Sequence, residues 1–351
     1  MRVLIATKVL AVFDALKDVK DVELQEALFS GQIYEGLAGV QLAIIDFEDV
    51  VPHPYGLDML KGVLAEKGVL FVSGQEFLSQ PGRWLAEARA AKGEPTVLPQ
   101  QKAVAFVSYS GGTGKTILAL DTAVHFARRT KMPVLLTEFT YGDSALAAVT
   151  GLDGPYLFDL ATQLDVEAAK YKGVTLVPMD YEHCQDLPVR QLEQYFEEQM
   201  AQYFEKQMAE HVLMVVDSRW PHGLIGAVQE KIDEWIVLAT PRIDAVENAR
   251  RLHQDLVKLK ERKELGPQAS VSIIINQKST ADSLALAGFE RALDLPTVRQ
   301  PDRFEGQLGR EILSLIYGKK NWRKYEPKGF LANLGRRLGF GRRGRSDLDS
   351  R

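Results

Sequence analysis

The run Gly111-Gly-Thr-Gly-Lys-Thr116 constrains the fold of this chain more than any other stretch of its 351 residues. An apolar segment, 103–108, precedes it and predicts a strand, and helix-forming residues follow from Lys115 onward. Glycines let successive backbone N–H groups point at phosphate oxygens, and the N-terminus of the following helix adds a positive dipole. Strand, loop and helix together predict a P-loop that binds a nucleoside triphosphate.

The residue types in this loop predict distinct roles. We expect the Lys115 ammonium to bridge the terminal phosphates and the Thr116 hydroxyl to ligate Mg²⁺. The glycines and Thr113 would contribute backbone N–H groups. The residues expected to contact the nucleotide in the loop are Gly111, Gly112, Thr113, Gly114, Lys115 and Thr116.

A second magnesium-binding group is expected at the end of a later apolar strand. The run 211–217 reads His-Val-Leu-Met-Val-Val-Asp, so Asp217 stands where such an acid belongs. We expect Asp217 to hold Mg²⁺ together with Thr116, through a water molecule. Strand ends are often polar, so an acid that only terminates a strand is the alternative.

Apolar runs after residue 100 predict a parallel sheet buried on both faces, because most of them are nearly continuous rather than alternating. A polar link containing Gly93 and Pro99 precedes them and indicates a domain boundary near residue 100. The predicted strands are 103–108, 134–138, 174–178, 212–217, 234–239 and 271–276.

The first 98 residues predict a smaller α/β unit in which strands alternate with helices, which again indicates a parallel sheet. The predicted strands are 3–6, 40–46, 69–73 and 96–98, and the predicted helices are 9–16, 25–37, 57–66 and 84–92. The fold class is therefore α/β with three regions: 1–98, 99–318, and a basic extension, 319–351.

Composition excludes several classes of protein. The formal net charge of -4 and the absence of a helix-borne basic stripe in the core make nucleic acid an unlikely partner. One cysteine, Cys184, permits neither an internal disulfide nor a Cys-x-x-Cys metal site. No run of about 18 apolar residues is present, so we expect a cytoplasmic protein.

Two further segments have features that the predicted strands and helices do not explain. An eight-residue unit in 194–201 is repeated in 202–209, which predicts a helix lengthened by about two turns. A harmless duplication is the simpler interpretation; a partner-binding face is the alternative, with these aromatic side chains exposed. They are Tyr195, Phe196, Tyr203 and Phe204.

The basic extension combines cations with apolar residues. If helical, Phe330, Leu331, Leu334 and Leu338 would form one apolar stripe, with arginines beside it. This composition is typical of an interfacial helix on an anionic membrane, where each nearby cation contributes about 1 kcal/mol. A disordered solubilising tail, or one that touches nucleic acid, is the alternative.

The run Ser110-Gly-Gly-Thr-Gly-Lys-Thr116 resembles the deviant Walker A motif of the MinD/ParA family, a SIMIBI-type group of P-loop ATPases. The segments 134–146 and 239–251 are similar to the branch called CpaE/TadZ, pilus-assembly proteins. The resemblance covers about residues 102–318. It implies ATP and Mg²⁺ as cofactors, adenine contacts from Asn276 and from the loop containing Pro301, and a homodimer.

The departures from that family predict weak or absent hydrolysis. Its signature lysine falls at Ser110, and the second of its two acids after the next strand, which orients the attacking water, falls at Thr140. A threonine hydroxyl cannot accept a proton at neutral pH. Glu138 and Asp143 are the carboxylates nearby that could substitute, although their spacing does not favour it.

The CpaE/TadZ branch also carries an N-terminal receiver-like domain of the flavodoxin-like fold, and residues 1–98 have that strand–helix rhythm. Asp46 occupies the phosphoacceptor position, at the end of the predicted strand 40–46. The acid pair that holds Mg²⁺ in receivers is replaced by Ala6-Thr7-Lys8. A degenerate receiver is therefore expected, with Asp46 as an ordinary strand-end acid.

The resemblance implies an ATP-binding localisation or assembly factor for a type IV (Tad/Flp-type) pilus or related secretion machine. It would act from the cytoplasm at the inner face of the membrane or at a cell pole, with secretion proteins as partners. Two alternatives stay open: an active MinD/ParA-type ATPase switch for positioning division sites, flagella or plasmids, and a response regulator driven by phosphorylation of Asp46.

Overall fold

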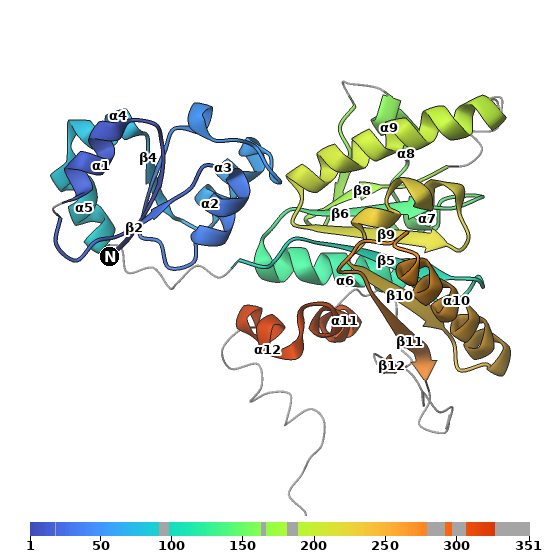
Figure 1. The fold of residues 1–351 in the computed structure, drawn as a ribbon. Coiled ribbons are helices and arrows are strands. Elements are labelled where there is room, and N and C mark those ends of the chain that lie inside the picture. Colours follow the sequence, from blue (N-terminus) through green and yellow to red (C-terminus); the bar gives the residue numbers. More distant parts are fainter. Residues whose placement is uncertain are drawn as a thin grey trace, which may run out of the picture.

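The computed structural model describes residues 1–17, 19–90, 98–162, 166–180, 189–278, 292–296 and 307–326. Within these ranges the chain forms two separate α/β units, each built around its own sheet (Figure 1). The smaller sheet has four strands and the larger has eight. The prediction of an α/β fold with parallel sheets is confirmed.

The N-terminal unit is a parallel sheet of order β2-β1-β3-β4. Helices α2 and α3 cover one of its faces, and α1, α4 and α5 cover the other. Its strands are β1 (Arg2–Ala6), β2 (Glu23–Glu26), β3 (Leu42–Ile45) and β4 (Leu70–Val72). Its helices are α1 (Leu10–Lys17), α2 (Ser30–Gly36), η1 (Phe47–Asp49), α3 (Leu57–Glu66), α4 (Gly74–Ser79) and α5 (Pro81–Ala90).

The helix predicted over 25–37 is wrong at its start. Residues Glu23–Glu26 instead pair with β1 as an edge strand, and the helix begins only at Ser30. The Gln32 side chain accepts the backbone N–H groups of Leu28 and Phe29, which fixes this later start. The strand predicted over 96–98 falls largely outside the described residues, and Leu98 itself is not in a strand.

The larger sheet has the order β12-β11-β10-β5-β9-β6-β8-β7, and all its pairs are parallel except β7 with β8. The predicted strands are all present; the short strands β7 and β12 at the two edges were not predicted. The strands are β5 (Lys102–Ser108), β6 (Val134–Phe139), β7 (Ala169–Tyr171), β8 (Val174–Val177), β9 (Leu213–Arg219), β10 (Glu234–Ala239), β11 (Ser270–Lys278) and β12 (Ala292–Pro296).

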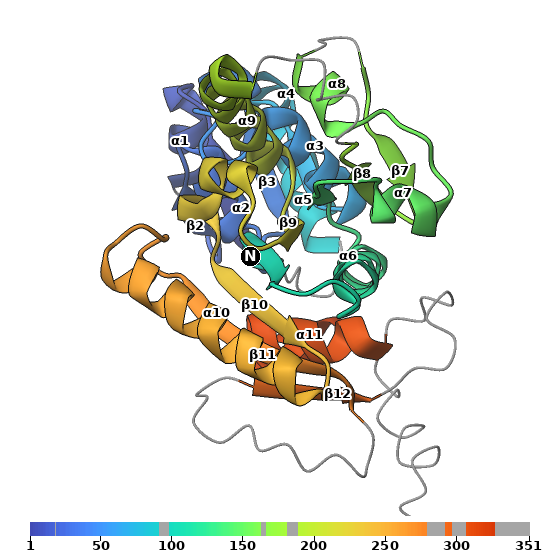
Figure 2. The same cartoon turned by 90° about the vertical axis from the view of Figure 1, so that its right-hand side faces the viewer.

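Helices cover both faces of this sheet, as its continuous apolar strands require (Figure 2). Helices α6, α11 and α12 pack on one face, and α9 and α10 on the other. The helices are α6 (Lys115–Thr130), α7 (Ala145–Thr150), α8 (Leu157–Thr162), α9 (Val189–Glu210), η3 (Gly223–Ala227), η4 (Gln229–Lys231), α10 (Ile243–Glu261), α11 (Gln307–Tyr317), α12 (Lys319–Trp322) and η5 (Arg323–Tyr325).

The duplicated unit lies within α9, so the predicted long helix is confirmed. The prediction that its aromatic residues are exposed is wrong for Phe204, which is fully buried, while Tyr203 is half-buried. Phe204 packs edge-on against Phe139, with ring centroids 5.6 Å apart. The side chains of Tyr195 and Phe196 lie outside the described residues.

The first part of the basic extension is packed rather than free. Trp322 is fully buried among aromatic rings of α6 and α11. Arg310 of α11 holds Glu326 with two N–H···O contacts of 2.5 and 3.0 Å. The predicted apolar stripe, 330–338, lies outside the described residues. Among the helices that the structure describes, none is both long and apolar enough to cross a membrane.

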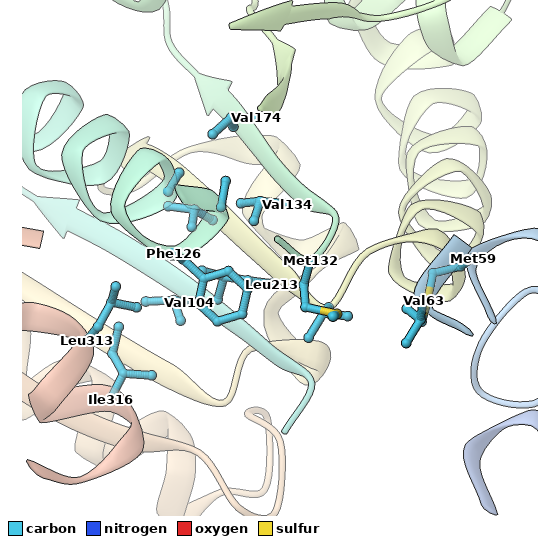
Figure 3. Close-up of a cluster of buried hydrophobic side chains, with 14 of the residues drawn as sticks. Met59, Val63, Val104, Phe126, Met132, Val134, Val174, Leu213, Leu313 and Ile316 are labelled. Atoms are coloured by element: carbon cyan, nitrogen blue, oxygen red, sulfur yellow. The ribbon is translucent and has the colours of Figure 1, made fainter. Parts of the chain in front are cut away.

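Hydrogen bonds from the N-terminal unit reach backbone carbonyls at the ends of two helices of the larger unit. The Gly56 N–H donates to the Ala209 carbonyl at the end of α9 (2.7 Å), and the Lys67 ammonium donates to the Thr130 carbonyl at the end of α6 (2.7 Å). In Figure 3, Met59 and Val63 of α3 lie next to the part of the larger unit that contains Met132. The N-terminal unit therefore contacts the ends of both helices.

Acid should destabilise the packing around α6. Burial, together with Arg129, Arg310 and Arg128, lowers the pKa of His125 from 6.5 to about 4. The unfolded chain then takes up the proton first, so stability present above pH 6.5 is lost as the pH falls toward 4. By urea unfolding we expect His125 to contribute about 3 kcal/mol of the stability lost over this window. His211 and His222, whose pKa values are also lowered by burial, add to that loss. His125→Phe should make the loss about 3 kcal/mol smaller than in the wild type, whereas the exposed His53→Phe should leave it unchanged. Equal profiles for both variants would contradict this account.

Candidate functional site

The P-loop lies where the sequence predicts it, at the carboxyl end of β5 in the middle of the larger sheet. Helix α6 starts at Lys115, and Gly114 precedes it as N-cap. Gly112 and Gly114 have φ of 70° and 83°, a left-handed conformation that side chains with a Cβ rarely adopt. The loop thus has the conformation in which backbone N–H groups can face an anion.

Asn276, at the end of β11, fixes this loop from the side. Its amide Nδ2 donates to the Thr113 carbonyl (2.9 Å), and its Oδ1 accepts the N–H of Gln277 (2.9 Å). A Cβ on Gly114 would lie 2.5 Å from that Nδ2. In this structure Asn276 therefore supports the P-loop; the adenine contact stays a prediction. Pro301 lies outside the described residues.

The proposed magnesium ligands meet at the adjacent strand end. The Thr116 hydroxyl donates directly to the Asp217 carboxylate, which is buried at the end of β9. Burial raises the pKa of Asp217, while Lys115 and the Thr116 bond oppose that rise. A buried carboxylate and a hydroxyl are hard oxygen donors, and P-loop magnesium uses one or two carboxylates plus phosphates. The residues present therefore fit Mg²⁺ with a triphosphate.

Glu138 lies beside Asp217 on the neighbouring strand β6. Burial first, and Asp217 second, raise the pKa of Glu138 to about 7. Its carboxylate accepts the Ser144 hydroxyl (2.5 Å) and the backbone N–H groups of Ala145 (3.1 Å) and Leu146 (3.4 Å). Glu138 therefore anchors the first turn of α7.

The structure also shows the positions of Asp143, the second possible substitute carboxylate, and of Ser110, which replaces the signature lysine. Asp143 is exposed in the loop after β6, and Ser110 is half-buried, with its carbonyl accepting the Ser108 hydroxyl (2.7 Å). A catalytic role for Asp143 or Glu138 stays a prediction. The structure brings Lys115, Thr116, Asp217 and Glu138 together and leaves Asp143 at the surface.

A contact that sequence reasoning missed joins the loops after β6 and β9. The His222 Nε2 lies 3.2 Å from the Thr140 carbonyl, and the His222 ring lies 4.3 Å from the Tyr141 ring. Burial lowers the pKa of His222, and its Nδ1 accepts the N–H of Leu224 (3.2 Å). These partners require a neutral imidazole with its proton on Nε2. Only the position of His222 shortly after the predicted acid Asp217 could have hinted at this contact.

The phosphoacceptor position of the N-terminal unit is closed. Asp46 is 8% exposed. One of its carboxylate oxygens accepts the Thr7 hydroxyl and the other accepts the Gly74 N–H (3.0 Å). Lys8 pairs with Asp49 instead (3.2 Å). Asp46 thus ties the ends of β1 and β3 to the start of α4.

Comparisons with solved structures find limited similarity to several proteins. A cell division ATPase MinD from Pyrococcus furiosus is 17% identical, with 68% of this chain and 100% of that chain aligned at a TM-score of 0.46. A plasmid partition protein of Borrelia burgdorferi, solved with AMPPNP, is 14% identical (63% and 99%, TM-score 0.49). McdA from Cyanothece is 14% identical (64% and 98%, TM-score 0.46).

No protein-family model matches this sequence. No curated protein matches it either. Similarities of this extent assign neither a family nor an activity.

Gly114 should be far less tolerant of a side chain than Gly111. Gly114→Ala adds a Cβ at positive φ and against Asn276, whereas a Cβ on Gly111 meets nothing within 4 Å. Strain of about 1–3 kcal/mol corresponds to roughly a 5- to 150-fold loss of affinity. We therefore expect Gly114→Ala to weaken ATP binding by at least about fivefold and Gly111→Ala to change it little, measured by titration calorimetry with Mg²⁺. Equal losses in both variants would contradict this geometry.

Proposed function

We propose that this chain binds ATP with Mg²⁺ and acts as a localisation or assembly factor rather than as a fast ATPase. The observation that carries the proposal is the contact between Thr116 and Asp217 beside a left-handed glycine loop. Magnesium, when bound, would neutralise charge on the phosphates, and Thr116 and Asp217 are the residues that would hold it. Lys115 and the loop backbone would bind the phosphates.

Slow or absent hydrolysis is supported by the surroundings of the phosphate site. Thr140 supplies no carboxylate, and its carbonyl is engaged by His222. Glu138 is committed to the start of α7. Ser110, in place of the family's lysine, has no charge to offer a partner's nucleotide. The described residues thus provide for binding and leave the water-orienting role without an evident group.

Within this proposal the chain resembles CpaE/TadZ proteins, which implies a pilus-type secretion machine as its partner and a homodimer as its assembly. ATP would favour one conformational or dimeric state to the extent that it binds that state more tightly. The cytoplasmic face of the membrane is the proposed location, with the basic residues beyond 326 as an anionic-lipid contact. An active positioning switch of the MinD/ParA type is the alternative.

We expect the protein to bind ATP without hydrolysing it. Lys115→Ala should weaken ATP binding in Mg²⁺ by at least about tenfold, because a charge-assisted phosphate contact contributes on the order of 1.5–3 kcal/mol. Phosphate release by the wild type should not exceed that of Lys115→Ala. Turnover that disappears in the variant would support the switch instead, and absence of saturable ATP binding by the wild type would sink the proposal.

The N-terminal unit is proposed to be a pseudo-receiver. Because Thr7 and Gly74 occupy the Asp46 oxygens, acetyl phosphate with Mg²⁺ should leave Asp46 unmodified. Intact-mass measurement should show equal masses before and after treatment, for the wild type as for Asp46→Asn. A mass increase of one phosphoryl group in the wild type alone would establish a working receiver.

A further inference from the structure

The carboxyl edge of the N-terminal sheet exposes apolar side chains. In doubly wound sheets this edge carries the functional site. Here the strand-end acid Asp46 is buried and its carboxylate oxygens are hydrogen-bonded. Around it, Leu10 is 76% exposed, Leu28 62%, Val51 47% and Phe29 39%. We call these four side chains the N-terminal apolar patch.

The patch is built by three neighbouring loops. Leu10 follows β1, Leu28 and Phe29 follow β2, and Val51 follows β3. The N–H of Val51 donates to the Leu28 carbonyl (2.9 Å), and Phe29 forms a β-bridge with Val51. Backbone hydrogen bonds therefore hold two of these loops together above β1. Grouped apolar exposure of this kind marks an interaction surface.

Charge indicates what kind of segment would cover the patch. Residues 1–90 contain thirteen Asp and Glu against eight Lys and Arg. Glu26 and Glu48 are exposed beside the patch, and Lys8 is paired with Asp49. A complementary partner would be apolar and basic. Residues 327–351 of the same chain contain seven Lys and Arg against two Asp, with phenylalanines and leucines among them.

The starting point and length of that segment allow the contact. Trp322 and the Arg310–Glu326 pair anchor the chain immediately before residue 327. Tyr325, just before this point, packs against the same hydrophobic cluster that contains Tyr34 of α2. About 25 residues follow, and at about 3.3 Å each they reach up to roughly 80 Å. The anchored residues before position 327 therefore lie next to the N-terminal unit.

We propose that residues 327–351 dock on the N-terminal apolar patch of their own chain. Arginines of the segment face the acidic surroundings of the patch, and its phenylalanines and leucines cover Leu28, Phe29 and Val51. The contact requires no nucleotide. Its consequence, that a docked segment is withheld from an anionic membrane, rests on the proposed function.

Photo-crosslinking of the full chain tests this contact. Benzoylphenylalanine placed at Leu28, an exposed position, should crosslink to residues 327–351 within the monomer band, as mapped by mass spectrometry. The same probe at the exposed Ile243 in the larger unit is the matched control and should give no such product. Crosslinks from position 28 that run to a second copy, or that avoid 327–351, would overturn the proposal.

Charge reversal in the segment provides the second test. Arg336→Glu with Arg337→Glu should reduce the crosslink from position 28 at least about fivefold, because the surroundings of the patch are acidic. An unchanged yield would overturn the electrostatic basis of the docking.

Phe29→Asp in the otherwise native chain should increase flotation with phosphatidylserine vesicles, whereas Phe71→Asp, equally exposed at 39%, should not. Equal flotation of both variants would contradict the proposal that docking keeps residues 327–351 away from the membrane. ATP titration tests the phosphate site separately. Failure of the docking proposal therefore does not imply failure of the proposed ATP binding, and the reverse also holds.

Discussion

The contact between the Thr116 hydroxyl and the Asp217 carboxylate depends on two neighbouring strands ending at the same level. β5 leads into the P-loop and β9 ends in the acid, and their parallel pairing sets both side chains at one edge of the sheet. A buried carboxylate is costly without a donor or a cation. Around this pair the structure arranges Lys115, the left-handed glycines and Asn276, so the phosphate site is preformed by packing.

Helices α6 and α9 are held by the N-terminal unit at their C-terminal ends, which lie away from the phosphate site. α6 starts at the P-loop and ends at Thr130, whose carbonyl binds Lys67; α9 leads into β9 and ends where Gly56 binds Ala209. The Gln101 side chain, just before β5, also donates to the Met208 carbonyl and to that of His211 (3.0 Å). The N-terminal unit is therefore mechanically connected to both elements that carry the proposed magnesium ligands.

In both units a strand-end acid that the sequence analysis considered as a candidate functional residue is hydrogen-bonded to the start of a helix. In the larger unit Glu138 anchors α7, and in the smaller unit Asp46 anchors α4. In each case a carboxylate at a strand end accepts backbone N–H at the start of a helix, where the helix dipole favours negative charge. Glu138 contacts α7, the next helix in the chain, and Asp46 contacts α4, which follows the neighbouring strand β4. Such acids contribute to the stability of the fold.

The sequence alone determined the P-loop, the strand carrying Asp217 and most strands of both sheets, because these depend on local residue order and on continuous apolar runs. It failed at β2, whose short, exposed edge strand has no apolar periodicity, and at the edge strands β7 and β12. The tertiary structure decided that Asn276 supports Thr113, that Glu138 and Asp46 are engaged, and that Trp322 is buried. Each of these contacts joins segments whose proximity follows from strand order and helix packing, and no local pattern in the sequence encodes that order.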